Sequence, residues 1–138
     1  MNDLKRDNKK IIAVVGVSKD EKKFGFRVFK DMIKKGEKVY GINPRADFIL
    51  GQKIYSKIQD IPEKPDIVIT VIPPEVTEKI VDDCISIGVK EIWMQPGSES
   101  EKAIKKAQDN GISVIYNACI MLTTDKDDTP LLKNINIF

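Results

Sequence analysis

A repeated order of helix, glycine and strand constrains the fold of this chain more than any other sequence feature. In three places, apolar residues at helical spacing stop at a glycine and a short apolar run follows. The glycines are Gly36, Gly88 and Gly111, and the runs are Val39–Ile42, Glu91–Met94 and Ile112–Tyr116. Glycine suits the left-handed position after a helix because it has no Cβ. Helices alternating with strands in this way predict right-handed βαβ crossovers and therefore a parallel sheet.

Three more apolar runs complete the predicted sheet. Ile11–Val15 and Ile67–Ile72 are clear strands, and Lys53–Ser56 is a shorter, weaker one. With 138 residues, the chain fits one domain around a single core. We therefore predict an α/β fold: a doubly wound, mainly parallel sheet of five to six strands in a single three-layer domain. Ser98 is the expected N-cap of the third helix, with Glu101 completing a capping box.

Composition narrows the possible partners. The 23 basic and 21 acidic residues leave a net charge of only +2, too little to indicate nucleic-acid binding. No apolar run is long enough to cross a bilayer. Two distant cysteines suit a reducing compartment, so we expect a cytoplasmic protein. The chain has no histidine, which removes the commonest general base and most zinc sites.

The two ends of the chain differ from its centre. Residues 1–9 are polar and partly basic, and we expect a flexible arm there; residues 10–119 form the predicted core domain. Residues 120–138 are a C-terminal extension that is first polar and acidic, then apolar from Pro130 to Phe138. The apolar end is expected to pack on its own domain or against a second subunit, so a homo-oligomer or a protein partner remains open.

The segment after the first strand has the features of a phosphate site. In a doubly wound sheet, ligands bind beyond the carboxyl ends of the strands. Gly16 lets the backbone approach a pyrophosphate, and the following helix offers free N–H groups. The full G-x-G-x-x-G fingerprint is absent, because Ser18 replaces the second glycine and the next one is Gly25. Gly16, Ser18 and Gly25 together favour phosphate binding over a purely structural turn.

The end of the second strand indicates which nucleotide is bound. Folds that bind NAD place Asp or Glu there for the ribose hydroxyls, whereas this chain has Asn43-Pro44-Arg45. A cation in place of an acid suits a phosphorylated ribose, as in coenzyme A or NADP. Pro73-Pro74 and Gln95-Pro96-Gly97 follow strands expected to flank the first one, and could form the opposite wall.

The two cysteines are expected to be buried. Cys84 falls on the apolar stripe of its helix, and Cys119 follows the fifth strand. Neither has a histidine to activate it. A redox role for Cys119 stays open because of its position at a strand end.

The succession of these segments resembles a known family. IIAVVGVSKD, GEKVYGINPR, GQKIYSKIQDIP, DIVITVIPP, GVKEIWMQPG and GISVIYNAC are similar to the small stand-alone coenzyme A-binding proteins, which share a domain with the alpha subunit of succinyl-CoA synthetase. The similarity runs from about Lys10 to Cys119. It implies a Rossmann-like sheet with coenzyme A across its carboxyl edge. Relatives often carry Asp-Arg-Cys where this chain has Asn117-Ala118-Cys119.

The resemblance also implies roles for individual residues. Gly16, Val17 and Ser18 would bind the pyrophosphate, with Arg27 close by. Asn43, Pro44 and Arg45 would bind the phosphorylated ribose and the adenine. Ile72, Pro73 and Pro74 would flank the adenine or the pantetheine arm. Gln95, Gly97, Asn117 and Cys119 would lie near the thiol end.

Three functional hypotheses follow. The first is a protein that binds coenzyme A or acyl-CoA, in a regulatory or carrier role, without catalysis of its own. The second is an NADP-binding oxidoreductase or redox sensor, for which Tyr116 and Cys119 are the only nearby candidate groups. The third is a regulatory module whose partner is another protein.

Overall fold

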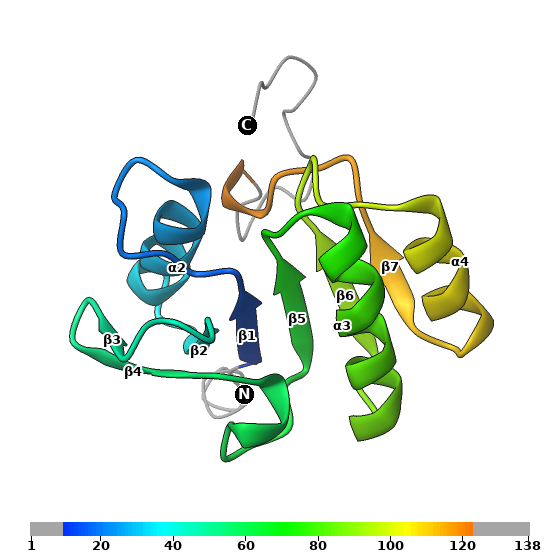
Figure 1. Ribbon diagram of the computed structural model, residues 1–138, viewed down its shortest axis with the longest axis horizontal. Helices are drawn as coiled ribbons and strands as arrows, with labels where there is room; N and C mark the ends of the chain where they lie inside the picture. The colour runs from blue at the N-terminus through cyan, green and yellow to red at the C-terminus, as the bar shows by residue number, and fades with distance from the viewer. Residues whose placement is uncertain (1–9, 123–138) are drawn as a thin grey trace, which may run out of the picture.

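The computed structural model describes residues 10–122 and shows a seven-stranded sheet with helices on both faces (Figure 1). The predicted N-terminal arm, residues 1–9, lies outside the described residues. So does the predicted C-terminal extension apart from residues 120–122. No helix among the described residues is long and apolar enough to span a membrane.

The sheet has the order β3-β4-β2-β1-β5-β6-β7. Its strands are β1 (Ile11–Val15), β2 (Lys38–Ile42), β3 (Phe48–Ile49), β4 (Gln52–Tyr55), β5 (Ile67–Thr70), β6 (Glu91–Met94) and β7 (Ser113–Ile115). All pairings are parallel except β3 with β4. The chain moves outward from β1 to β2 and β4, then returns to the other side of β1 at β5. This reversal is the point at which doubly wound sheets bind ligands.

The predicted Rossmann-like fold is confirmed, with differences in the strands. The described residues form seven strands, whereas five to six were predicted. The prediction missed the edge strand β3, because two residues are too few to show an alternating apolar pattern. A two-residue turn joins β3 to β4, with Leu50 and Gly51 at positive φ (54° and 75°). The predicted strand Ile67–Ile72 ends at Thr70, and Ile112–Tyr116 shortens to Ser113–Ile115.

The helices cover the two faces of the sheet unequally. Helix α2 (Phe24–Lys34) lies on one face, together with the short 3-10 turn η2 (Ile120–Leu122). Helices α3 (Pro74–Ile87) and α4 (Glu101–Asp109) pack side by side on the other face (Figure 1). Each face therefore has its own hydrophobic core.

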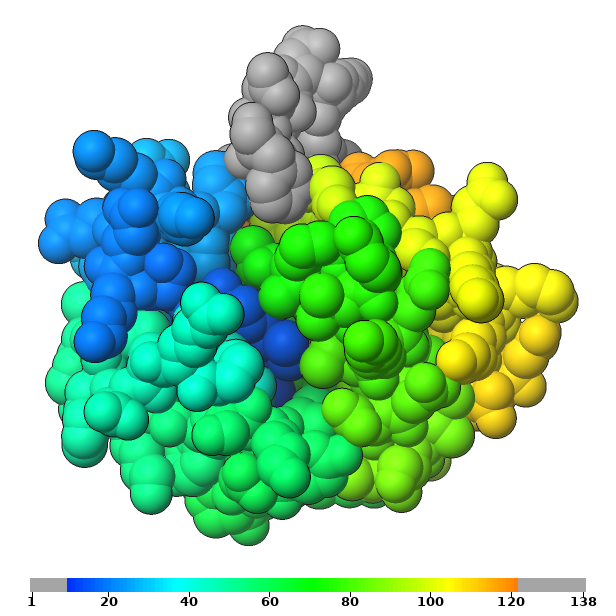
Figure 2. All heavy atoms as spheres, viewed as in Figure 1, coloured from blue at the N-terminus to red at the C-terminus, as the bar shows by residue number. Residues whose placement is uncertain are grey.

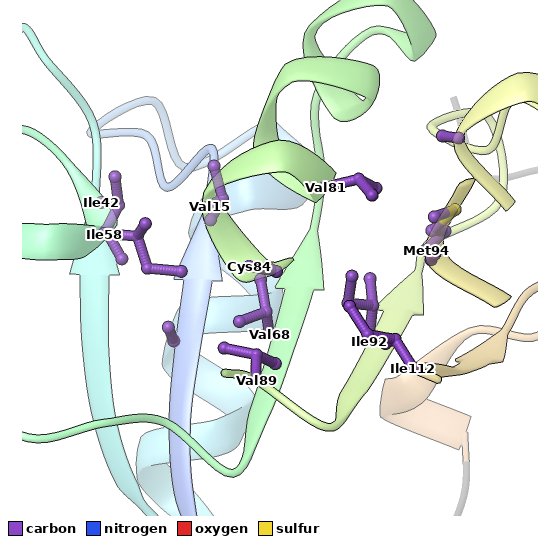
Figure 3. Packing of buried hydrophobic residues seen from close by; sticks show 13 residues of the cluster. Val15, Ile42, Ile58, Val68, Val81, Cys84, Val89, Ile92, Met94 and Ile112 are labelled. Carbon is purple, nitrogen blue, oxygen red and sulfur yellow. The ribbon is translucent and has the colours of Figure 1, made fainter. Parts of the chain in front are cut away.

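The core beneath α3 and α4 joins both halves of the sheet. Val15, Ile42 and Val68 of the strands pack with Val81 and Cys84 of α3. Cys84 is fully buried, as its helical stripe predicted. Figure 3 shows Ile58 beside Ile42, near the carboxyl ends of β1 and β2.

The predicted cap of α4 is wrong by two residues. The N-cap is Ser100, whose hydroxyl accepts a hydrogen bond from the Ala103 N–H at 3.1 Å. Ser98 is completely buried, and its hydroxyl lies 2.8 Å from that of Thr70 and 2.9 Å from the Gln95 carbonyl oxygen. Ser100 was missed because the residue three positions later is Ala103, whereas Ser98 has Glu101 at that spacing. The buried contacts of Ser98 keep it out of the cap.

The crossover from β4 to β5 contains one short 3-10 turn, η1 (Ile58–Asp60), where doubly wound folds commonly place a helix. A turn of three residues covers less of the sheet than a helix does. The side of α3 that faces this crossover therefore remains partly uncovered, which leaves space beside it at the carboxyl edge of the sheet.

Candidate functional site

A cleft of about 350 Å³ lies at the carboxyl ends of β1, β2, β4 and β5, between η1 and α3. It is lined by Val15, Gly16, Ile42, Asn43, Pro44, Ser56, Lys57, Ile58, Ile72, Val76, Ile80 and Asp83. Figure 2 shows the hollow with dark blue atoms at its floor, between the segment that follows β2 and the green atoms of α3. Four of the predicted site residues line it: Gly16, Asn43, Pro44 and Ile72.

Gly16 is required where β1 turns toward α2. Its φ is +106°, and a Cβ there would overlap the Val71 carbonyl oxygen and lie 2.8 Å from the Ile72 Cγ2. The Gly16 N–H donates to the Ile42 carbonyl oxygen at 3.0 Å, which extends the pairing of β1 with β2. The backbone of the loop can therefore lie directly against the end of β5.

The loop after Gly16 presents unused backbone donors. The N–H groups of Val17 and Ser18 have no acceptor among the described residues, while the Ser18 hydroxyl accepts from the Asp20 N–H at 3.0 Å. Helix α2 has neither a capping side chain at Lys23 nor an acidic residue in its first turn. Free amides and an uncapped helix N-terminus both favour an anion here.

Gly25 has a packing role in this loop. It is buried in the first turn of α2, and a Cβ there would overlap the Gly16 carbonyl oxygen. The absence of a side chain lets α2 start directly against the Gly16–Val17 backbone. Gly25 therefore shapes the predicted phosphate site although it does not line the cleft.

Asn43 links the ends of β1 and β2. Its side-chain amide donates to the Val17 carbonyl oxygen at 2.7 Å, and its side-chain oxygen accepts from the Arg45 N–H at 2.7 Å. The same side chain thus holds the loop after β1 and the turn after β2.

Two cations follow the strands β2 and β4, whose carboxyl ends border the cleft. The predicted Arg45 is exposed and is not part of the cleft wall, whereas Lys57, which the sequence prediction missed, is. Lys57 follows the short strand β4. The strand-end rule would have identified Ser56 and Lys57 if it had been applied to that weak strand as well.

The segment after β5 forms the start of α3. Pro73 is the N-cap and Pro74 the first helical residue, and both are exposed beside the cleft residue Ile72. Val76 and Ile80 continue the cleft wall down α3. Val76 is 39% exposed because the adjacent crossover contains only the 3-10 turn η1 in place of a helix.

Gln95 does not face the cleft. It is completely buried, its amide donates to the Cys119 sulfur at 3.3 Å, and its side-chain oxygen accepts from the Ile120 N–H at 2.8 Å. Gly97 is exposed with φ +97°, and its N–H donates to the Glu99 carboxylate at 2.7 Å. The structure therefore uses Gln95 to hold the segment after β7.

The remaining predicted site residues lie in other surroundings. Cys119 is 1% exposed, and Asn117 is exposed at φ +63° in a shallow groove beside α4. Arg27 lines a different groove, with Phe26 and Met121, and its guanidinium lies 5.8 Å from the Phe24 ring centre. None of these three residues lines the cleft.

Groups capable of chemistry are few in and around the cleft. Its charged lining residues, among those described, are Lys57 and Asp83. Burial raises the pKa of the Cys84 thiol to about 12, so this sulfur is held as a thiol at neutral pH. The cleft combines apolar walls with a few polar side chains, and the loop that follows its lining residue Gly16 carries the free amides. This arrangement is suited to holding a nucleotide.

Comparison with known proteins agrees with this geometry. The family model for the CoA binding domain matches residues 10–125. The ADP-forming acetate–CoA ligase II subunit alpha of Pyrococcus furiosus is 32% identical over 82% of this chain and 27% of that subunit. The uncharacterized protein YneT of Bacillus subtilis is 30% identical over 80% of this chain and 82% of its own length. The chain spans less than a third of the acetate–CoA ligase subunit.

Solved structures are similar over the same region. A conserved hypothetical protein of Pyrococcus furiosus superposes with a TM-score of 0.78 and 35% identity, covering 81% of this chain and 97% of that one. The dinucleotide-forming acetyl-coenzyme A synthetase 1 of Candidatus Korarchaeum cryptofilum gives a TM-score of 0.66 and 35% identity over 83% of this chain and 27% of that one. The match of the family model to residues 10–125 shows that this chain belongs to the CoA-binding domain family.

Proposed function

We propose that this protein binds coenzyme A, or an acyl derivative of it, in the cleft between Gly16, Asn43 and α3. The observation that carries the proposal is the juxtaposition of free amides and apolar walls. The N–H groups of Val17 and Ser18 lack acceptors among the described residues, and they follow the Gly16 turn at the mouth of the cleft. A pyrophosphate would accept from these amides while the adenosine occupies the cleft.

The ribose phosphate distinguishes the proposed ligand from NAD. The end of β2 carries Asn43 and Arg45 in place of an acid, and Lys57 lines the cleft from the end of β4. In this proposal, both cations bind a phosphate on a ribose that lies beside Pro44. Family membership favours the 3′-phosphate of coenzyme A over the 2′-phosphate of NADP.

A role in binding without catalysis is part of the proposal. Cys84 and Cys119 are both buried, and the pKa of Cys84 is raised to about 12. Neither thiol is therefore placed to attack a ligand in the cleft. Among the described residues, the cleft lining contains neither a cysteine nor a histidine that could activate the hydroxyl of Ser56. These features suit a carrier or a regulatory sensor of coenzyme A.

The proposal is tested by thermal denaturation with coenzyme A, dephospho-coenzyme A, NADP and NAD. A ligand at 100 times its dissociation constant stabilises the fold by about 2.7 kcal/mol. We expect stabilisation by coenzyme A, less by dephospho-coenzyme A and none by NAD. Stabilisation by NADP alone would replace this proposal with the redox hypothesis, and no shift with any ligand would refute nucleotide binding.

A further inference from the structure

Asp83 is a charged residue that the proposed binding of phosphates does not use. It follows Val76 and Ile80 toward the C-terminal end of α3, and all three residues line the cleft. Residues spaced by four and three positions share one face of a helix. The rise of 1.5 Å per residue places Asp83 about 10 Å from Val76 along the helix axis. The carboxylate is therefore at the opposite end of the cleft from the start of α3.

The position of the phosphates determines which ligand group reaches this end. Gly16 and Ile72 lie together at the carboxyl edge of the sheet, where a Cβ on Gly16 would be 2.8 Å from the Ile72 side chain. With the pyrophosphate at that edge and the ribose beside Pro44, the base points down the cleft. Its walls there are Ile58 of η1 and Ile80 of α3, two apolar side chains suited to the faces of a purine.

The Asp83 carboxylate has one oxygen already engaged. Its Oδ1 accepts a hydrogen bond of 3.0 Å from the side-chain amide of Gln59, which comes from η1 across the cleft. This contact holds the carboxylate between η1 and α3. Among the described residues, the second oxygen accepts no hydrogen bond, and an ionised carboxylate accepts hydrogen bonds only. The group that it recognises must be a donor.

On the basis of the proposed function, we propose that Asp83 is the residue that selects the base of the ligand. It accepts a hydrogen bond from the exocyclic 6-amino group of adenine. A base with an oxygen at that position offers an acceptor to an acceptor, which costs the hydrogen bond and adds repulsion. The cleft therefore selects 6-aminopurine ligands over 6-oxopurine ligands, independently of the contacts to the phosphates.

The test compares coenzyme A with an analogue in which hypoxanthine replaces adenine, by calorimetric titration of the full chain. We expect the wild type to bind coenzyme A at least tenfold more tightly than the analogue. Asp83→Asn keeps the shape of the side chain and can present either a donor or an acceptor. We expect this variant to reduce the preference to less than threefold.

A matched control is available on the next residue. Asp82 is exposed, and its carboxylate contacts the Lys106 ammonium at 2.7 Å, away from the cleft. Asp82→Asn should retain the full preference. Equal affinity of the wild type for both ligands, or an unchanged preference in Asp83→Asn, would overturn the role of Asp83 while leaving coenzyme A binding intact. A wild type that binds neither ligand would overturn the proposed function, and this inference with it.

Discussion

The side-chain amide of Asn43, at the end of β2, donates a 2.7 Å hydrogen bond to the carbonyl oxygen of Val17, in the loop after β1. This contact fixes the direction of the Val17–Ser18 peptide and therefore that of the Ser18 N–H, one of the two amides proposed to bind the pyrophosphate. The other end of the same amide accepts from the Arg45 N–H. Asn43 therefore couples the two loops that border the proposed phosphate end of the cleft.

Asn43→Ala should weaken both the fold and the site. Loss of the two hydrogen bonds lowers the free energy of unfolding by about 1–3 kcal/mol, measured by urea denaturation. Coenzyme A affinity, measured by titration under native conditions, should fall as well. Asn110→Ala is the matched control, because Asn110 caps α4 with a 2.9 Å bond to the Lys106 carbonyl oxygen. An Asn110→Ala variant that lost as much affinity would contradict the assignment.

Gly16→Ala should be far more damaging than Gly36→Ala. Both residues have positive φ, but a Cβ on Gly36 meets nothing within 4 Å, whereas one on Gly16 overlaps the Val71 carbonyl oxygen. Gly36→Ala should cost about 1–2 kcal/mol, the strain of a left-handed alanine. Gly16→Ala should lower the free energy of unfolding by about 3 kcal/mol or more, because the backbone at Val71 must also move. Equal shifts of the two urea midpoints would show that the Gly16 loop relaxes freely.

Arg45→Ala and Lys57→Ala test the ribose phosphate. Removing Arg45 should weaken the binding of coenzyme A by about 1–3 kcal/mol, the range for a charge-assisted hydrogen bond. Removing the exposed Lys57 should weaken it by about 1 kcal/mol. Dephospho-coenzyme A, which lacks this phosphate, should bind each variant nearly as well as the wild type. Parallel losses for both ligands in calorimetric titrations would exclude the phosphate as their target.

Gln95→Ala should affect stability and thiol accessibility. The change removes the side-chain oxygen that accepts from the Ile120 N–H and opens space beside Cys119. We expect a loss of about 2–4 kcal/mol in unfolding free energy. Cys119 should also react faster with a thiol reagent, with peptide mapping to separate it from Cys84. Unchanged labelling of Cys119 would mean that Gln95 does not hold this segment closed.

Tyr40 provides a prediction for alkaline pH. Its hydroxyl donates a 2.5 Å hydrogen bond to the Glu63 carboxylate, which, with burial, raises the pKa of Tyr40 from 10.0 to about 12. A raised pKa means that folding favours the protonated phenol. The associated stability is complete below pH 10 and is lost as the pH rises from 10 to about 12.

The ultraviolet titration of the tyrosines should show this shift directly. Glu63→Gln removes the negative charge beside the phenol, so the Tyr40 pKa should move back toward 10. Tyr40→Phe identifies which part of the titration curve belongs to Tyr40. A Glu63→Gln curve identical with that of the wild type would show that the carboxylate does not set this pKa.

The alternation of helices and strands, and the carboxyl edge of the sheet at which the cleft lies, followed from the sequence alone. Local signals predicted the strands Val39–Ile42 and Glu91–Met94. In each case a short apolar run follows a glycine that ends a helix, and both features lie within about ten residues of each other in the sequence. Family resemblance added the proposed class of ligand. Gly16, Asn43 and Pro44 were identified because they directly follow predicted strands, and Ile72 was identified through the resemblance; all four line the cleft.

Only the tertiary structure decided which side chains line the cleft. Gln95 and Cys119 have the right positions after their strands, yet they face each other in the interior. Asp83 lies far from any strand end and enters the site because one 3-10 turn replaces a crossover helix beside α3. Strand ends are local features of a chain, whereas the direction of a side chain depends on packing between segments distant in sequence. That packing places Asp83 in the cleft and buries Gln95.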